Sequence, residues 1–178
     1  MEPNQQPNVA HALQHPDVVA HYDGETRVLM YSSEGKPVPL PRPRFIRNGR
    51  AFHVFTPRSP LTGRFAIGLR GWLTREMPQA MPVFPAGRCL AVSIVYRLHR
   101  PNSHFTSNNR SHPIKDACLN IAPTSNGDID NLAKYTLDAL QDCAIHDDRQ
   151  VVALCCTKIW SERHDSEGST TVLVRDMF

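Results

Sequence analysis

The sequence predicts a domain in which helices and strands are mixed, and three observations lead to this prediction. The chain has 178 residues, of which 40% are hydrophobic, and this is enough to bury a substantial core in one domain. Some segments have the 3.6-residue period of an amphipathic helix, whereas others are rich in the branched residues typical of strands. No run approaches the roughly 20 apolar residues of a membrane-spanning helix, so we expect no membrane partner.

The start of the chain has little hydrophobic pattern beyond a short stretch at residues 26–31. We therefore expect residues 1–35 to form a poorly ordered N-terminal extension and residues 36–178 to form the folded domain. The extension lacks the basic start and apolar run of a secretory signal. The five cysteines include no C-x-x-C spacing, which favours a reducing compartment. We expect a protein that is not secreted and works inside the cell, in the cytoplasm or on the nucleoid.

A hairpin is expected early in the domain. Residues 36–44 alternate proline with other residues, and this stretch should run extended because proline fixes φ and lacks an N–H. Asn48 and Gly49 form a hairpin-type turn signal ahead of the strand-like segment 51–56.

Two helices are expected further along. Residues 59–77 have apolar side chains spaced for one helix face, although three glycines weaken the prediction. Residues 130–142 have a clear apolar face, and Asp130 is a suitable N-cap because its carboxylate can accept a hydrogen bond from a free amide of the first turn.

Three further strands are expected, at residues 89–98, 151–160 and 169–175, and the first of these is expected to be central in the sheet. Between the first strand and the second helix, residues 100–127 are polar and show no pattern. A loop of that length in a compact domain is usually either functional or disordered.

Charge is distributed very unevenly along the chain. The net charge is −4 over residues 1–35, +13 over residues 36–115 and −6 over residues 116–178, and 16 of the 20 bases are arginine. A basic segment of this size indicates a polyanion, with nucleic acid as the first candidate, since the arginine fork suits phosphate. The alternative is ordinary surface arginine balanced in space by the acidic third. The candidate contacts that this segment supplies are Lys36, Arg42, Arg44, Arg110 and Lys115.

The candidate chemistry lies in two acidic pairs. If the backbone around Ile129 is extended, Asp128 and Asp130 point the same way and Ile129 points into the core. Asp147 and Asp148 precede the next strand, and a helix, a short loop and a strand that fold back would return this second pair beside the first. We expect three or four carboxylates to meet at one rim of the sheet.

Converging carboxylates repel one another and need a divalent cation, and oxygen ligands suit Mg²⁺ or Mn²⁺ better than zinc. Such a cation beside a basic surface can cut a phosphodiester, with Lys134 near the phosphate. Each residue also has a plainer interpretation: Asp130 as a cap, Lys134 as the ion-pair partner of Asp138, and the second acidic pair as a turn.

These residues also resemble the signature of a known family. Gly-Asp-Ile-Asp-Asn-Leu-Ala-Lys-Tyr-Thr-Leu-Asp-Ala-Leu (residues 127–140) and His-Asp-Asp-Arg-Gln-Val-Val (residues 146–152) are similar to the signature of RusA-type Holliday junction resolvases. That signature runs Asp-x-Asp-Asn-Leu-x-Lys, then Asp-Ala-Leu, then Asp-Asp-x-Gln-Val/Ile-Val. The resemblance extends over roughly residues 36–175.

The resemblance implies a small α+β nuclease with a mixed β-sheet flanked by helices. It implies a homodimer that uses Mg²⁺ or Mn²⁺ to resolve four-way DNA junctions in recombination and repair. The family's metal-binding carboxylates fall on Asp128, Asp130 and Asp148, and its catalytic lysine falls on Lys134. Whether Asp147 is also a ligand stays open.

Two details of the resemblance concern DNA contacts. Many members have a lysine where this chain has Lys158, which we expect to contact DNA. Members often have a base or proline just before the first aspartate, where this chain has Gly127, so Arg110, Lys115 or Lys158 would have to replace that base. Two alternatives to a junction resolvase remain: a nucleic-acid-binding protein without catalysis, and a metal nuclease that acts on flaps or forks.

Overall fold

The fold is built on a mixed five-stranded sheet. The computed structural model describes residues 18–40, 44–48, 51–55, 64–124, 127–141, 143–162 and 167–178. The strands of the sheet lie in the order β1-β2-β7-β5-β6. They are β1 (Val18–Asp23), β2 (Val28–Glu34), β5 (Leu90–Leu98), β6 (Val151–Trp160) and β7 (Gly168–Asp176). The pair β5–β6 is parallel and the other three pairs are antiparallel, which confirms the predicted α+β class.

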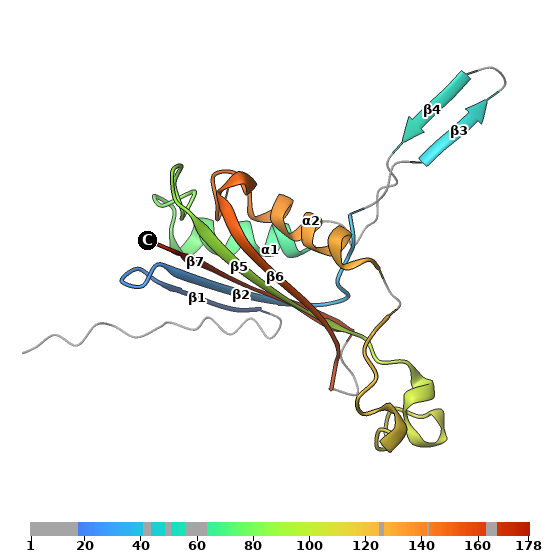
Figure 1. The fold of residues 1–178 in the computed structure, drawn as a ribbon. Helices are drawn as coiled ribbons and strands as arrows, with labels where there is room; N and C mark the ends of the chain where they lie inside the picture. Colours follow the sequence, from blue (N-terminus) through green and yellow to red (C-terminus); the bar gives the residue numbers. More distant parts are fainter. Residues whose placement is uncertain are drawn as a thin grey trace, which may run out of the picture.

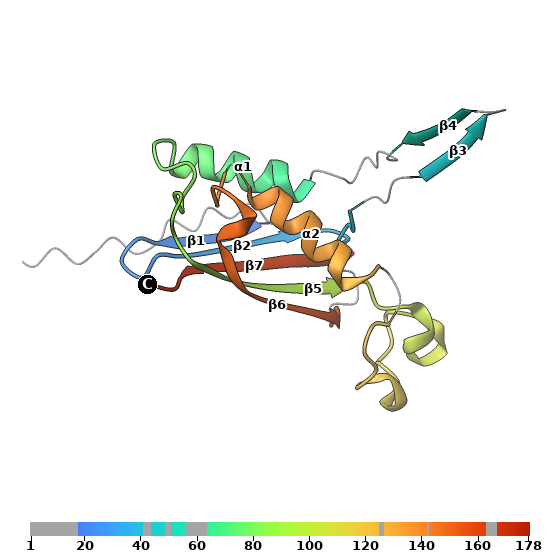
Figure 2. The same cartoon turned by 45° about the horizontal axis from the view of Figure 1, so that its top comes forward.

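Two helices cover one face of this sheet, α1 (Arg64–Glu76) and α2 (Ile129–Leu140) (Figure 1). Alternate residues of β2, β5 and β7 point toward them and are buried, and the rest of the core comes from the two helices, from Phe84 and from residues 143–145. Figure 2 shows α2 lying across the strands, with its first turn toward the end where β5 and β6 finish. Among the described residues, no helix is long and apolar enough to cross a membrane.

The expected N-terminal extension is wrong from residue 18 onward. β2 lies inside the sheet between β1 and β7, and its Leu29 and Tyr31 are fully buried. This strand is hard to recognise in the sequence because its outward-facing residues include the apolar Val28 and Met30, so the alternation of apolar and polar residues is weak. Residues 1–17 lie outside the described part of the chain.

The predicted hairpin is confirmed. β3 (Arg44–Asn48) pairs antiparallel with β4 (Ala51–Phe55) as a separate two-stranded sheet, and Asn48 faces Ala51 across the turn. The turn residues themselves, 49 and 50, lie outside the described part of the chain.

The predicted helices and remaining strands are also confirmed, with shorter bounds for the first helix because residues 59–63 are not described. Gly68 shows why a glycine occurs inside α1. A Cβ atom there would collide with the hydroxyl of Tyr31, so the glycine lets the helix pack closely on β2.

The polar segment after β5 forms an ordered loop with three short 3₁₀ turns. These are η1 (Asn102–His104), η2 (Thr106–Asn108) and η3 (Asp116–Cys118). The buried Arg100 holds this loop to the sheet, since its guanidinium donates to the carbonyls of Cys118 (2.9 Å) and Ser161 (3.5 Å). The loop therefore has a fixed structure of its own beside the start of α2.

Candidate active site

The first acidic pair lies at the N-terminus of α2. Asp128 is the N-cap, with extended backbone angles, and Asp130 lies within the first helical turn. The sequence-based assignment of Asp130 as the cap is therefore wrong by two residues, and Ile129 is 38% exposed rather than in the core. Both carboxylates are exposed, and negative charge is favoured at a helix N-terminus by the helix dipole.

A turn at Gly127 brings the chain into this helix. Gly127 has φ of 99°, a region that other residues adopt at a cost. Its carbonyl accepts a hydrogen bond from Lys158 Nζ at 2.9 Å, which ties the turn to β6. On the helix side, Asn131 Nδ2 lies 3.4 Å from Asp128 Oδ2, and the amide of Leu40 donates to the Asn131 carbonyl at 3.0 Å. The backbone of Asp128 is thus held between the sheet and the helix.

Lys134 lies one helical turn beyond Asp130, on the same exposed stripe of α2 as Asp138. Among the ion pairs that the structure describes, none joins Lys134 to Asp138. Because Lys134 and Asp130 are four residues apart in α2 and both exposed, their side chains leave the same face of the helix.

The two residues of the second acidic pair, Asp147 and Asp148, have different surroundings. Asp147 caps the short turn η4 (Asp148–Gln150), and Gln150 returns the bond by accepting from the Asp147 amide at 3.0 Å. Arg149 donates to both carboxylate oxygens of Asp147, at 2.8 and 2.7 Å. These hydrogen bonds hold the pKa of Asp147 well below its usual range. Asp148 is exposed.

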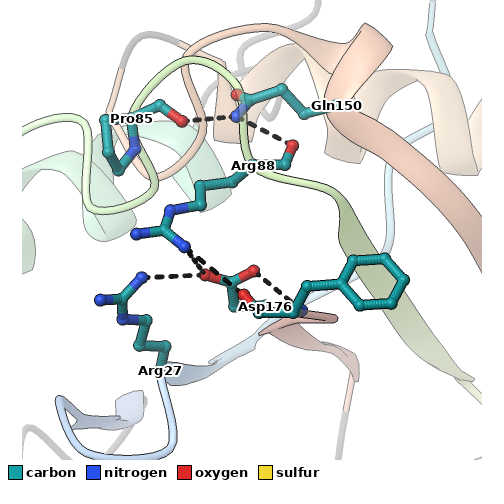
Figure 3. A network of polar contacts seen from close by, with 6 residues as sticks. Arg27, Pro85, Arg88, Gln150 and Asp176 are labelled. Atoms are coloured by element: carbon teal, nitrogen blue, oxygen red, sulfur yellow. Dashed lines mark hydrogen bonds and ion pairs between the residues drawn. The ribbon is translucent and has the colours of Figure 1, made fainter.

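A polar network fixes the turn that carries this pair (Figure 3). The Gln150 amide donates to the carbonyls of Pro85 (2.7 Å) and Arg88 (3.4 Å), which attaches η4 to the segment before β5. Arg88 in turn reaches the Asp176 carboxylate at 3.3 Å, and Arg27 reaches it at 3.2 Å. Burial alone would raise the pKa of Asp176, but a hydrogen bond from the Phe178 amide and the contacts with Arg27 and Arg88 together lower this pKa. A cleft of about 320 Å³ borders this network, between Arg88, Cys89, His146 and Arg149.

Within one chain the two acidic pairs do not meet, so the predicted convergence at one rim is wrong for a single chain. Asp128 lies level with the end of β6, because Lys158 contacts Gly127, whereas Asp148 begins the η4 turn that leads into the start of β6. The 12 residues of α2 separate them, which corresponds to about 18 Å along the helix. Among the described residues, no three acidic, histidine or cysteine side chains gather closely enough to hold a metal ion.

The sequence error has a physical cause. A helix and a strand that fold back on each other bring the start of the helix to the end of the strand. Asp147 and Asp148 lie between the end of the helix and the start of the strand. They therefore lie at the opposite end of the helix from Asp128 and Asp130.

The predicted DNA contacts lie in different settings. Lys36 is exposed, whereas three other bases donate to oxygens of the chain itself. Arg110 donates to Asn102 Oδ1 at 2.6 Å and to the Arg100 carbonyl. Lys115 Nζ donates to the Ser103 carbonyl at 2.9 Å, and Lys158 holds the Gly127 turn. Arg42 lies outside the described residues, and Arg44 begins β3.

Sequence reasoning missed Arg149 and Gln150, which set the geometry of the second acidic pair. A signal for them was present, because Asp-x-x-Gln at a turn has the spacing of a capping box, in which the cap and the third residue exchange hydrogen bonds. Read in that way, Asp147 would have been assigned to the turn and Asp148 left as the exposed carboxylate.

A mixed sheet with an acidic helix N-terminus and a nearby lysine is a suitable frame for phosphodiester chemistry, and comparison with known proteins defines the family. The family model described as endodeoxyribonuclease RusA matches residues 34–167. The chain belongs to this endonuclease family, which confirms the resemblance drawn from the sequence.

The chain is also 29% identical over 150 residues to an uncharacterized protein of Bacillus subtilis (strain 168), YqaN. That alignment covers 84% of this chain and 96% of the relative. The similarity therefore covers most of this chain and nearly the whole of the relative.

Replacement of Asp147 by Asn should leave DNA cleavage close to the wild-type level. Asn is an equally good cap for the η4 turn, and the charge that is removed is already paired with Arg149. Nicking of a branched DNA substrate, measured beside the melting temperature of the variant, tests this expectation. A loss of cleavage as deep as that of Asp148→Asn would make Asp147 part of the reactive centre.

Proposed function

We propose that the protein is a homodimeric endonuclease that uses Mg²⁺ or Mn²⁺ to resolve four-way DNA junctions, with each active site built from both subunits. The observation that carries this proposal is the position of the two acidic pairs at opposite ends of β6, which is an edge strand with exposed apolar side chains.

β6 is the last strand of the sheet, and its outer edge has no partner strand among the described residues. Val152 is 59% exposed, Leu154 48% and Ile159 37%, so apolar side chains are uncovered on both faces of this edge. A long apolar edge strand is a ready template for pairing with another strand. The partner we propose for this edge is β6 of a second copy of the chain, since most soluble oligomers are symmetric dimers.

Two-fold symmetry makes such a strand pair antiparallel. The start of β6 in one subunit then lies beside the end of β6 in the other. Asp148 begins the η4 turn that leads into the start of β6, and Asp128 and Asp130 lie level with the end of β6. Pairing therefore brings Asp148 of the partner subunit toward Asp128 and Asp130, and the same happens at the symmetric site.

The donors suit the cation that the family implies. Asp128 and Asp130 are exposed carboxylates within one helical turn, and Asp148 is also exposed. Hard oxygen ligands of this kind suit Mg²⁺ and Mn²⁺. When bound there, the cation supplies charge neutralisation at the scissile phosphate and a more acidic water. Two carboxylates alone make an incomplete set, so metal binding and dimerisation should be linked.

The chain's own residues orient the phosphate. The N-terminus of α2 offers a positive dipole end to an anion, and Lys134 adds a full charge one turn further along. A donor in this position stabilises charge that develops on the phosphate during cleavage. Two such sites related by a two-fold axis suit a substrate with two equivalent strands to cut, as a four-way junction has.

The proposal is tested with three labelled substrates of equal length: a synthetic four-way junction, a linear duplex, and a fork or flap. We expect symmetric nicks in the junction that require Mg²⁺ or Mn²⁺, and little cutting of the duplex. Equal or better cutting of the fork or flap would identify a nuclease for other branched DNA. Junction binding without nicks at any metal concentration would identify a binding protein.

A further inference from the structure

Lys158 makes a contact that the expected role in DNA binding does not explain. Its side chain is only partly exposed, and its ammonium donates to the Gly127 carbonyl at 2.9 Å. In the parallel register of the sheet Lys158 lies beside Tyr96, which is fully buried, so the lysine points to the helix-covered face. A side chain directed under α2 is poorly placed to reach a phosphate outside.

The group that Lys158 holds directly precedes the candidate ligands. Gly127 turns the chain with φ of 99°, and the next residue is Asp128. Without the lysine, the Gly127 carbonyl would lose its side-chain partner and the turn would lose its tie to the sheet. The helix side of Asp128 is already fixed by its own backbone, whose carbonyl accepts from Leu132 at 3.1 Å. Lys158 supplies the opposite support.

We infer that Lys158 is a positioning residue: through the Gly127 carbonyl it sets the direction in which Asp128 and Asp130 present their carboxylates to the metal. This role rests on the proposed function, because it assumes that these aspartates bind a divalent cation. Partners that orient metal ligands in this way typically contribute 10–100-fold to metal affinity. Lys158 is a structural link of the site rather than a DNA contact.

The test compares three variants with the wild-type protein. Lys158→Met keeps the length of the side chain and removes its donor, and Lys158→Arg keeps a donor. Thr157→Val is the matched control, since Thr157 is the neighbouring residue of β6 and is exposed on the opposite face of the sheet. Melting temperatures establish that all variants fold. Mn²⁺ binding is measured calorimetrically without DNA, and junction binding is measured in EDTA over a range of salt concentrations.

We expect Lys158→Met to weaken Mn²⁺ binding by about tenfold or more, and its salt slope for junction binding to remain that of the wild type. Lys158→Arg should recover part of the metal affinity, and Thr157→Val should match the wild type in both measurements. Unchanged Mn²⁺ affinity in Lys158→Met would overturn the inference. A salt slope reduced by about one, with metal affinity unchanged, would show instead that Lys158 neutralises a phosphate.

The outcome also separates this inference from the proposed function. A wild-type protein that binds Mn²⁺ more tightly than Lys158→Met but cuts no junction would remove the function and leave the positioning role. A protein that cuts the junction, but whose Mn²⁺ affinity is the same in Lys158→Met as in the wild type, would keep the proposed function and lose the positioning role.

Discussion

The variants Asp128→Asn, Asp130→Asn and Asp148→Asn are each expected to lose junction cleavage and to bind the junction as tightly as the wild type or more tightly. Each change removes one oxygen ligand of a set that has few to spare, so the cation is no longer held at the scissile phosphate. Each change also removes a negative charge that faces DNA, which lowers repulsion. Nicking in Mg²⁺ and gel-shift affinity in EDTA are measured in parallel.

Asp138→Asn is the matched control, because Asp138 lies on the exposed stripe of α2 that also carries Asp130, two turns further along the helix. It loses the same charge at a greater distance from the N-terminus and should cut normally. Near-wild-type nicking by Asp128→Asn would contradict the assignment of the metal ligands.

Lys134→Ala is expected to fold, to bind the junction, and to lose about a hundredfold or more in single-turnover cleavage. The reason is that a charge held near the phosphate stabilises the transition state more than the bound substrate. As a partner of Asp138 alone, Lys134 would contribute only about 0.3–0.5 kcal/mol to the helix. The two roles differ by orders of magnitude in their effect on cleavage.

The variant Asp138→Ala distinguishes the two possible roles of Lys134. If Lys134 acts on the phosphate, loss of Asp138 should leave the cleavage rate nearly unchanged. Equal behaviour of Lys134→Ala and Asp138→Ala would reduce Lys134 to a surface residue of α2.

Local sequence pattern predicted the elements whose signal is local. β5 has nine residues in which alternate side chains are buried, and the apolar stripe of α2 has helical spacing, so both were found from the sequence. β2 was missed because its place in the sheet depends on pairing with β7, which lies more than a hundred residues away in the chain. Pattern within a short window carries no information about such a partner.

The candidate site, like the fold, was predicted only in part from the sequence. The residues of the acidic pairs were found from their spacing, but their arrangement was not, because it depends on the direction in which α2 crosses β6. Asp147 is engaged by the guanidinium of Arg149. In the sequence, Arg149 cannot be distinguished from any other surface arginine. Likewise, Arg110 and Lys115 bind carbonyl and amide oxygens of the loop after β5, which charge counting cannot reveal.

Mixed dimers test the central claim, that each active site takes carboxylates from two subunits. Asp128→Asn and Asp148→Asn are each expected to be inactive alone, and the two are unfolded together, refolded and assayed on a four-way junction. A dimer with one subunit of each kind regains one intact site, formed by Asp128 of one subunit and Asp148 of the other. Random mixing should therefore restore about a quarter of the wild-type sites. No recovery of nicking, in a mixture shown to contain mixed dimers, would contradict the claim and place each site within a single chain.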